Sequence, residues 1–229
     1  MSRVRVVILD IDGTLIDSND AHAQAFLDAA EELGLEVPEF REVWRRIGMG
    51  GDKLIPEVWG FEKESERGEK LNARKGEIFR ERFLPTLQPT PGARALLHRM
   101  RDDGIKLVVA TSADREDLAG LLERAGVQDL IQEATSADDV EESKPDPDIV
   151  HAARDEGGFP REQTVMLGDT PYDVEAANRA GVPIVAVRSG GWGDEDLRGA
   201  VAVYDHPADL LEHFDESPVG RGNGGGNGS

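Results

Sequence analysis

The sequence predicts an α/β fold, a doubly wound parallel sheet with an inserted all-helical cap. Short apolar runs rich in β-branched residues recur along the chain, and most are followed by polar residues and then by helical periodicity. A long segment after the first of these runs carries helical patterns without any further strand-like run. Buried strands that alternate with helices imply βαβ units and a parallel sheet covered on both faces.

The strands of the core are expected where the apolar runs are shortest and most continuous. The expected buried strands are residues 4–9, 107–110, 165–167 and 184–187, with a weaker candidate at 131–134 and an edge strand at 201–204. Apolar residues at helical spacing predict core helices at residues 93–101, 117–122 and 171–180. The order of these elements favours a sheet of crossover units.

The cap is expected between the first and second strands. Four helical patterns fill this segment, at residues 21–33, 40–47, 53–59 and 64–83. Polar residues and prolines at 17–19 and 85–91 predict linkers or hinges. We therefore divide the chain into a core, a cap and a glycine-rich tail expected to be disordered: residues 1–17 with 86–215, residues 18–85, and residues 216–229.

The composition limits the classes of function. The 229 residues carry a formal charge of -20 and no cysteine, so disulfides and thiolate metal sites are excluded and binding to nucleic acid is not expected. The acidic excess indicates a well-solvated surface or, alternatively, a salt-loving host. The first strand follows the N-terminus directly, and no apolar run approaches the roughly 20 residues of a membrane span. A cytoplasmic monomer or homodimer without a membrane contact is expected.

The most informative motif directly follows the first strand. Asp10 and Asp12 leave the end of a buried run and meet Gly13. Carboxylates are rarely buried without a cationic partner, and a hard divalent metal with oxygen ligands would supply one. The motif therefore predicts a metal site at the end of a core strand.

Polar residues follow the other strands as well. Thr111 and Ser112 come after the second strand, Lys144 follows the third crossover, and Asp169 with Asp173 follows the fourth strand. Ligands bind beyond the carboxyl ends of parallel strands, where the strand order reverses. Each residue alone has a simpler explanation as a helix cap or a surface side chain. All of these explanations would have to coincide at one edge of the sheet, which favours a functional site.

These four motifs, in this order, resemble those of the haloacid dehalogenase superfamily. The closest similarity is to its phosphatase branch with a helical C1-type cap, and it covers the chain up to about Leu211. The resemblance implies that Asp10 is the nucleophile that forms an aspartyl-phosphate, and that Asp12 is the general acid and then the general base. It also implies that Mg²⁺ is held by Asp10, the Asp12 backbone carbonyl and Asp169, with support from Asp173.

The same resemblance assigns the phosphoryl group to Thr111, Ser112 and Lys144. An acidic residue at Asp12 favours phosphate esters over carbon–halogen or carbon–phosphorus cleavage, because an ester oxygen needs a proton to leave. We expect a Mg²⁺-dependent phosphatase for a small phosphomonoester, either phosphoglycolate-like or a sugar phosphate. A phosphomutase of the beta-phosphoglucomutase type and a catalytically weak phosphate-binding or regulatory module stay open as alternatives.

The cap is expected to read the leaving group of the substrate. A glycine-containing loop between two cap helices has the right character to reach the core, although its charged residues fit a solvated helix end about equally well. Trp44, Met49 and Trp59 are expected in the cap interior. The candidate specificity residues are His22, Arg45, Arg46, Gly48 and Lys53.

Overall fold

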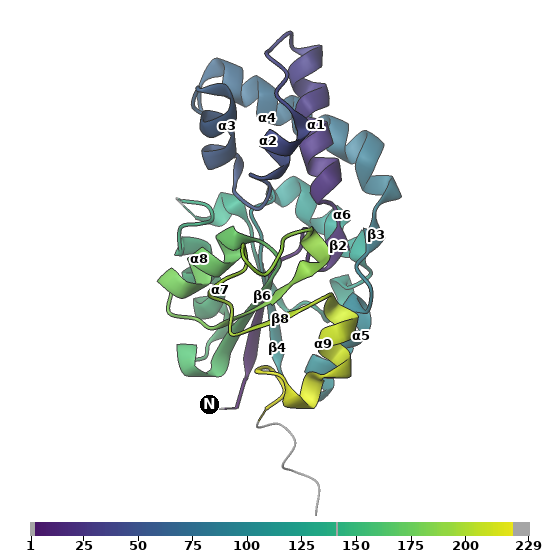
Figure 1. The fold of residues 1–229 in the computed structure, drawn as a ribbon, viewed down its shortest axis with the longest axis vertical. Coiled ribbons are helices and arrows are strands. Elements are labelled where there is room, and N and C mark those ends of the chain that lie inside the picture. The colour runs from purple at the N-terminus through teal and green to yellow at the C-terminus, as the bar shows by residue number, and fades with distance from the viewer. Residues whose placement is uncertain (1–2, 141, 222–229) are drawn as a thin grey trace, which may run out of the picture.

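A helical cap stands over an α/β core in the computed structural model, which describes residues 3–140 and 142–221 (Figure 1). Across these residues the core sheet has six parallel strands in the order β5-β4-β1-β6-β7-β8. The predicted fold class is confirmed. The strands are β1 (Val6–Leu9), β4 (Lys106–Ala110), β5 (Glu133–Thr135), β6 (Thr164–Gly168), β7 (Ile184–Val187) and β8 (Ala202–Tyr204).

Helices cover both faces of this sheet. They are α5 (Ala93–Asp102), α6 (Arg115–Ala125), α7 (Asp148–Gly157), α8 (Pro171–Arg179) and α9 (Pro207–Glu212). Successive side chains of a strand point to opposite faces. Val7 and Leu9 accordingly join the cluster that includes α5, α6 and α9, whereas Val6 and Ile8 join the cluster of α7 and α8. Burial on both faces explains why β1 is continuously apolar.

The order of the strands places the functional motifs together. From β1 the chain adds β4 and β5 on one side of the sheet, and then β6, β7 and β8 on the other. Leu9 pairs with Val109 of β4 and with Leu167 of β6. The residues that follow these three strands therefore meet at one edge of the sheet, at the point where the strand order reverses.

The cap is all-helical, as expected. It contains α1 (Asn19–Glu32), α2 (Phe40–Trp44), α3 (Gly51–Trp59), α4 (Glu66–Ile78) and a π-helical turn at Phe79–Phe83. Helices α1 and α4 pack side by side, and Phe26, Leu71 and Phe79 are buried between the cap elements. Helix α2 ends at Trp44 rather than at the expected residue 47, and a loop continues to Gly48, whose φ of 106° is in the left-handed region.

Two short strands join the cap to the core. Strand β2 (Ile16–Asp17) pairs antiparallel with β3 (Gln88–Pro89), so the outgoing and returning linkers lie side by side. The residue boundaries of 1–17, 18–85 and 86–215 for core and cap stay predictions.

Three segments differ from the sequence expectation. Helices α7 and α9 were not expected, because α7 has only a narrow apolar stripe, which is buried against the sheet, and α9 has six residues. The expectation of disorder from residue 216 is wrong for residues 216–221. Val219 is fully buried there, and the Ser217 hydroxyl accepts a hydrogen bond from the Gly220 amide at 3.1 Å. Residues 222–229 of the expected tail lie outside the described part of the chain.

Candidate active site

Asp10 lies directly after β1 at the centre of the site. Its amide donates to the Leu167 carbonyl at 2.9 Å, which ties the end of β1 to β6. The chain then turns at Gly13, whose φ is 75°. A side chain at this position would collide with the Asp169 carboxylate, so the turn requires glycine both for its conformation and for the close approach. The predicted motif therefore forms a tight loop against the neighbouring strand end.

Lys144 connects two of the carboxylates. Its Nζ lies 2.5 Å from Asp10 Oδ1 and 2.8 Å from Asp173 Oδ1, and the residue is fully buried. Burial lowers the pKa of the Lys144 ammonium. The Asp10 and Asp173 carboxylates raise it by a larger amount, so the pKa lies above its ordinary value. Lys144 is therefore charged and fixed in position by the two carboxylates.

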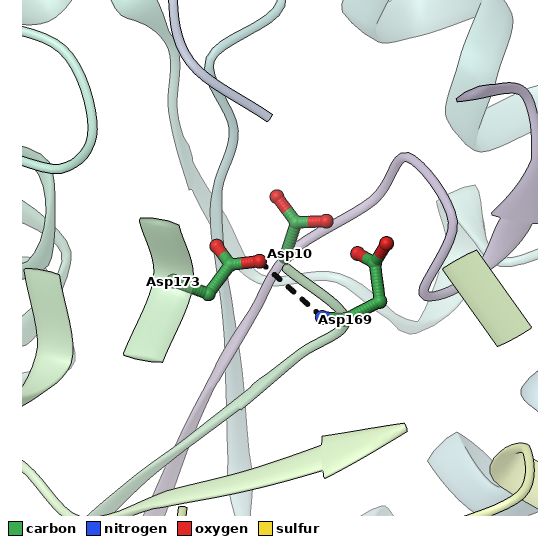
Figure 2. A group of neighbouring side chains, drawn as sticks. All are labelled: Asp10, Asp169 and Asp173. Atoms are coloured by element: carbon green, nitrogen blue, oxygen red, sulfur yellow. Dashed lines mark hydrogen bonds between the residues drawn. The ribbon is translucent and has the colours of Figure 1, made fainter. Parts of the chain in front are cut away.

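Asp169 and Asp173 approach Asp10 from the segment after β6. Figure 2 shows the three side chains converging on one region, and one oxygen from each lies within 4.8 Å of the others. The Thr14 hydroxyl donates to Asp169 Oδ1 at 2.9 Å, and the Asn19 amide donates to Asp169 Oδ2 at 3.1 Å. The structure thus brings the three predicted carboxylates together, with Thr14 and Asn19 as partners that the sequence analysis did not identify.

Asp173 also fixes the start of helix α8. Its Oδ2 accepts hydrogen bonds from the Thr170 hydroxyl at 2.7 Å and from the Thr170 amide at 3.0 Å. The Thr170 hydroxyl in turn accepts from the Asp173 amide at 3.1 Å, and this bond forms a capping box together with the one from the Thr170 amide. Its other oxygen is the one that faces Lys144. Asp173 thereby joins the local structure of α8 to the position of Lys144.

The charge balance of this cluster fits a divalent cation. Three buried carboxylates face the single ammonium of Lys144, so one positive charge is set against three negative charges when all three carboxylates are ionised. Oxygen donors are the ligands that Mg²⁺ and Ca²⁺ prefer. The buried acidic cluster can therefore hold a divalent metal ion.

Without such an ion, burial raises the pKa of Asp10 from 3.8 to about 7; Lys144 opposes this shift, whereas Asp173 and Asp12 add to it. Burial likewise raises the pKa of Asp169 well above its ordinary value, with Asp10 and Asp173 adding to the rise. A bound cation would favour the ionised carboxylates and reverse this effect.

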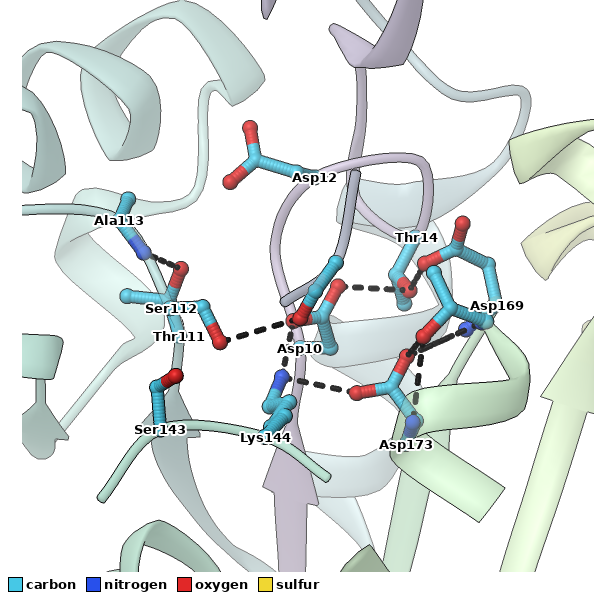
Figure 3. Close-up of polar contacts among 12 residues, drawn as sticks. Asp10, Asp12, Thr14, Thr111, Ser112, Ala113, Ser143, Lys144, Asp169 and Asp173 are labelled. Carbon is cyan, nitrogen blue, oxygen red and sulfur yellow. Dashed lines mark hydrogen bonds and ion pairs between the residues drawn. The ribbon is translucent and has the colours of Figure 1, made fainter. Parts of the chain in front are cut away.

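Asp12 points away from the other carboxylates. Figure 3 shows its side chain apart from Asp10, on the side of the loop away from Lys144. Its Oδ1 accepts from the Ser18 hydroxyl at 2.5 Å and lies 2.8 Å from Nε2 of His22. Burial would raise the pKa of Asp12, but His22 and Ser18 outweigh burial and the net shift is downward. The Asp12 carboxylate therefore links the core loop after β1 to the first cap helix, α1.

The residues after β4 lie on the side of Asp10 opposite to Asp169 and Asp173 (Figure 3). Thr111 is fully buried, and its hydroxyl accepts from the Ala113 amide at 3.0 Å. The Ser112 hydroxyl donates to the Gly48 carbonyl of the cap loop at 3.1 Å. Thr111 and Ser112 thus lie at the predicted edge, and Ser112 contacts the cap directly.

The cap loop also contacts the segment that carries Lys144. The Ser143 hydroxyl donates to Asp52 Oδ1 at 2.5 Å and accepts from the Gly50 amide at 3.1 Å. Lys53 forms ion pairs with Glu142 and with Asp146, the latter at 3.3 Å. The residue next to Lys144 is therefore held by the cap, and the cap lies closed over the core.

A small cavity lies between cap and core beside Asp10 and Asp12. Of the predicted specificity residues, the structure brings His22 and Gly48 to this cavity. It does not bring Arg45, Arg46 or Lys53 there. The cap contributes the following lining residues: His22, Phe26, Ile47, Gly48, Met49, Gly51, Leu54, Asn72 and Lys75.

Long-range partners explain why the cap cations lie elsewhere. Arg46 donates to Glu57 at 2.9 Å on the outer side of the cap, and Lys53 is engaged by the core carboxylates. The Arg45 side chain is exposed, and its backbone carbonyl accepts from the Tyr172 hydroxyl at 2.6 Å. Lys75 and Asn72 were missed, because in the sequence they are two polar residues within a highly charged helix.

The fold and this set of side chains define a hydrolase of the haloacid dehalogenase type. The family model for haloacid dehalogenase-like hydrolases matches residues 7–187. The chain belongs to this family. The expected resemblance is therefore confirmed, and it extends from β1 through β7.

Similar proteins narrow the class further. The phosphoglycolate phosphatase of Rhodospirillum rubrum is 32% identical over 215 residues, which cover 90% of this chain and 89% of that protein. The phosphoglycolate phosphatase of Aquifex aeolicus is 30% identical and covers 94% of this chain and 99% of its own length. The crystal structure of a hydrolase from Pseudomonas syringae matches with a TM-score of 0.85 and 30% identity, over 93% of this chain and 98% of that chain.

The expectation of an enzyme of the phosphatase type is confirmed by these relatives. In residues 3–140 and 142–221, no helix is both long enough and apolar enough to cross a membrane.

Proposed function

We propose that the protein is a Mg²⁺-dependent phosphatase that hydrolyses a small phosphomonoester through an aspartyl-phosphate on Asp10. One observation supports this most strongly: the side chains that follow the core strands and crossovers converge on Asp10 beneath a closed cap. Lys144 contacts Asp10 directly, and Asp169 lies within the same acidic cluster. A monomer or homodimer and a cytoplasmic location stay predictions.

In the first step, an oxygen of Asp10 attacks phosphorus and the bond from phosphorus to the ester oxygen breaks. The leaving oxygen takes a proton from Asp12, on the cavity side of the loop. In the second step, a water molecule attacks phosphorus, Asp12 removes its proton, and the bond to Asp10 breaks. The lowered pKa of Asp12 keeps the carboxylate ionised in the free protein, which is the form that the second step uses. For the first step, the negative charge of a bound phosphoryl group would raise this pKa.

Three further residues hold the phosphoryl group in this proposal. Lys144 offsets negative charge at Asp10, while Thr111 and Ser112 provide hydroxyl and backbone groups after β4. Their positions are set before substrate binds, which is the condition for effective electrostatic stabilisation. Mg²⁺ would be held by Asp10, the Asp12 carbonyl and Asp169, with Asp173 in support, and when bound it would offset and orient phosphoryl charge.

The alternatives receive less support. A phosphomutase has to bind a second phosphate, yet Lys75 is the one lysine or arginine lining the cavity among the described residues. A binding or regulatory module does not need a nucleophile, an acid–base residue and an acidic cluster together. The assembled set of Asp10, Asp12, Lys144 and Asp169 therefore favours catalysis.

The decisive experiment compares the protein with Asp10→Asn. Phosphate release from 2-phosphoglycolate and p-nitrophenyl phosphate is measured with Mg²⁺ and with EDTA. We expect Asp10→Asn to lose on the order of 10⁴-fold or more of the activity, because no other group replaces a nucleophile. Mass spectrometry of acid-quenched wild-type protein should find one phosphoryl group on Asp10.

The matched control is Asp155→Asn, which changes an exposed aspartate on α7 that is bonded to Arg154. It should retain wild-type activity. Undiminished hydrolysis by Asp10→Asn, or activity that is the same in EDTA, would contradict the proposal.

A further inference from the structure

Asn19 connects the first cap helix to the acidic cluster of the core. It is the first residue of α1, and it is buried. Its Nδ2 donates to Asp169 Oδ2 at 3.1 Å and to the carbonyl of Gly190, just after β7, at 3.2 Å. One side-chain amide therefore joins the start of the cap to the ends of two core strands, β6 and β7.

A role in starting α1 does not account for these contacts. Asparagine at a helix start commonly accepts a hydrogen bond from a backbone amide of the first turn. Here Ser18 occupies the N-cap position, and both hydrogen bonds that Asn19 Nδ2 donates go to the core. The side chain of Asn19 is thus directed at the core rather than at its own helix.

The orientation of the Asp169 carboxylate is set by neutral groups. The Thr14 hydroxyl donates to Oδ1 at 2.9 Å, and Asn19 donates to Oδ2. Gly190 closes the third side, because a side chain at that position would collide with the Asp169 carboxylate. The carboxylate therefore has a separate donor on each oxygen and little room to turn.

No cation balances this carboxylate within the described residues. Asp169 is fully buried, and the Lys144 ammonium pairs with Asp10 and Asp173 rather than with Asp169. A buried carboxylate that is held by hydrogen bonds and lacks a cation has the character of a metal ligand. Outer partners of this kind orient a ligand before the metal binds.

The other end of the Asn19 amide has no partner. Its Oδ1 is buried and accepts no hydrogen bond from the part of the chain that the structure describes. Because Oδ1 and Nδ2 share one carbon, this oxygen also lies near the Asp169 carboxylate. A buried acceptor without a donor is costly, and Mg²⁺ usually keeps several water molecules in a protein site. The unpaired oxygen therefore favours a hydrated cation at the cluster.

We propose that Asn19 is a positioning residue for the divalent metal, which holds the Asp169 carboxylate in the orientation that binds the cation. This inference rests on the proposed function and adds to it that the cap helix α1 sets the affinity of the core for Mg²⁺. Asn19 acts through Asp169 and takes no part in the chemical steps. Its loss should therefore weaken metal binding and leave the reaction of the metal-loaded protein almost unchanged.

The test measures the dissociation constant of Mg²⁺ by isothermal titration calorimetry, on the full chain without substrate. Asn19→Ala removes the amide, whereas Asn19→Leu removes it and keeps a side chain of similar size. In both variants the dissociation constant should rise by roughly 10–100-fold, the usual effect of losing an outer partner of a metal ligand. In phosphate release, the Mg²⁺ concentration for half-maximal rate should rise in parallel, and saturating Mg²⁺ should restore kcat to within about 3-fold of the wild type.

Gln24→Ala is the matched control, because it removes another amide of α1, one that donates to Asp28. Its dissociation constant for Mg²⁺ should equal that of the wild type. Unchanged Mg²⁺ binding in Asn19→Leu overturns the inference, even if Asn19→Ala binds more weakly, since filled space rather than the amide would then be what matters. A loss of kcat that saturating Mg²⁺ does not restore overturns it as well. If the wild type itself takes up no Mg²⁺, the metal dependence in the proposed function fails, which is a separate result.

Discussion

The core and the cap contribute to the site in opposite ways. On the core side, Lys144 forms ion pairs with both Asp10 and Asp173, so the positions of all three are set by the fold. On the cap side, Lys75 lies in the wall of the cavity, and its ion pair with Asp117 is long, at 3.8 Å. Groups that perform chemistry benefit from being fixed in advance, whereas groups that recognise a substrate have to leave an interaction for it. In the proposed function, the core therefore performs the chemistry and the cap is expected to select the substrate.

Asp12 lies on the boundary between these regions. It belongs to the core loop, but its carboxylate is held by Ser18 and by His22 of the first cap helix. Closure of the cap thereby also positions the proposed proton carrier. Of the substitutions discussed below, the one at Asp12 should have the largest effect on activity. It removes a group with a proposed role in the chemistry, although its hydrogen-bond partners belong to the cap.

Asp12→Asn should reduce kcat for alkyl phosphates by about 10²–10⁴-fold, because an amide can neither protonate the leaving oxygen nor activate water. p-Nitrophenolate leaves without a proton, so the first step with p-nitrophenyl phosphate should be affected far less. Rapid-mixing measurements should then find a burst of about one p-nitrophenolate per active site, followed by slow turnover as the aspartyl-phosphate persists.

Asp17→Asn changes a nearby exposed carboxylate and is the control for this variant. It should retain activity and show no burst. Equal losses for alkyl and nitrophenyl esters without a burst would argue that Asp12 only supports the structure of the loop.

The same division explains what the sequence could predict. Asp10, Asp169 and Asp173 are specified by their order along the chain and by the strand ends that they follow, and parallel strands bring those ends together regardless of loop detail. No such rule orders the cap. Arg46 and Lys53 are near the glycine loop in sequence, but Glu57 and Glu142 engage them in the folded chain.

Lys75 illustrates the same limit from the other side. Its helix, α4, also carries Arg67, Lys70 and Arg74, and nothing in the spacing marks Lys75 as the buried member. Its burial depends on contacts with Phe26 and Phe79, which are distant in sequence or on the next turn. The cap residues that line the cavity are therefore defined by packing between helices rather than by a local motif.

The second prediction concerns the buried acidic cluster of the core and the divalent cation that would balance its charge. In the metal-free fold the pKa of Asp10 is raised from 3.8 to about 7 by burial, against the effect of Lys144. The folded protein therefore binds more protons than the unfolded chain between these two values. The stability contributed by Asp10 is complete below the lower value and is lost as the pH rises through the upper one.

Asp10→Asn should abolish this dependence. Without metal, the variant should become more stable relative to the wild type by on the order of 4 kcal/mol between about pH 4 and about pH 8. Mg²⁺ at about 100 times its dissociation constant should stabilise the wild type by about 2.7 kcal/mol and narrow this difference. Thermal unfolding with EDTA or Mg²⁺ measures both effects. A stability difference between variant and wild type that does not change with pH or Mg²⁺ would contradict this account of the acidic cluster.

The smallest effect is expected where the cap loop meets the core. Asp52 accepts hydrogen bonds from the Ser143 hydroxyl at 2.5 Å and the Ser143 amide at 3.4 Å. Asp52→Asn keeps the first interaction but turns an NH₂ group toward the amide, so cap closure should weaken by about 1 kcal/mol. Because closure is coupled to substrate binding, KM should rise by roughly 3–10-fold, while kcat at saturation and the unfolding temperature change little.

Glu57→Gln, which alters a carboxylate paired with Arg46 within the cap, should leave KM unchanged. A fall in kcat with constant KM would instead mean that Asp52 acts on Lys144 through Ser143, and that the cap takes part in catalysis as well as in selection.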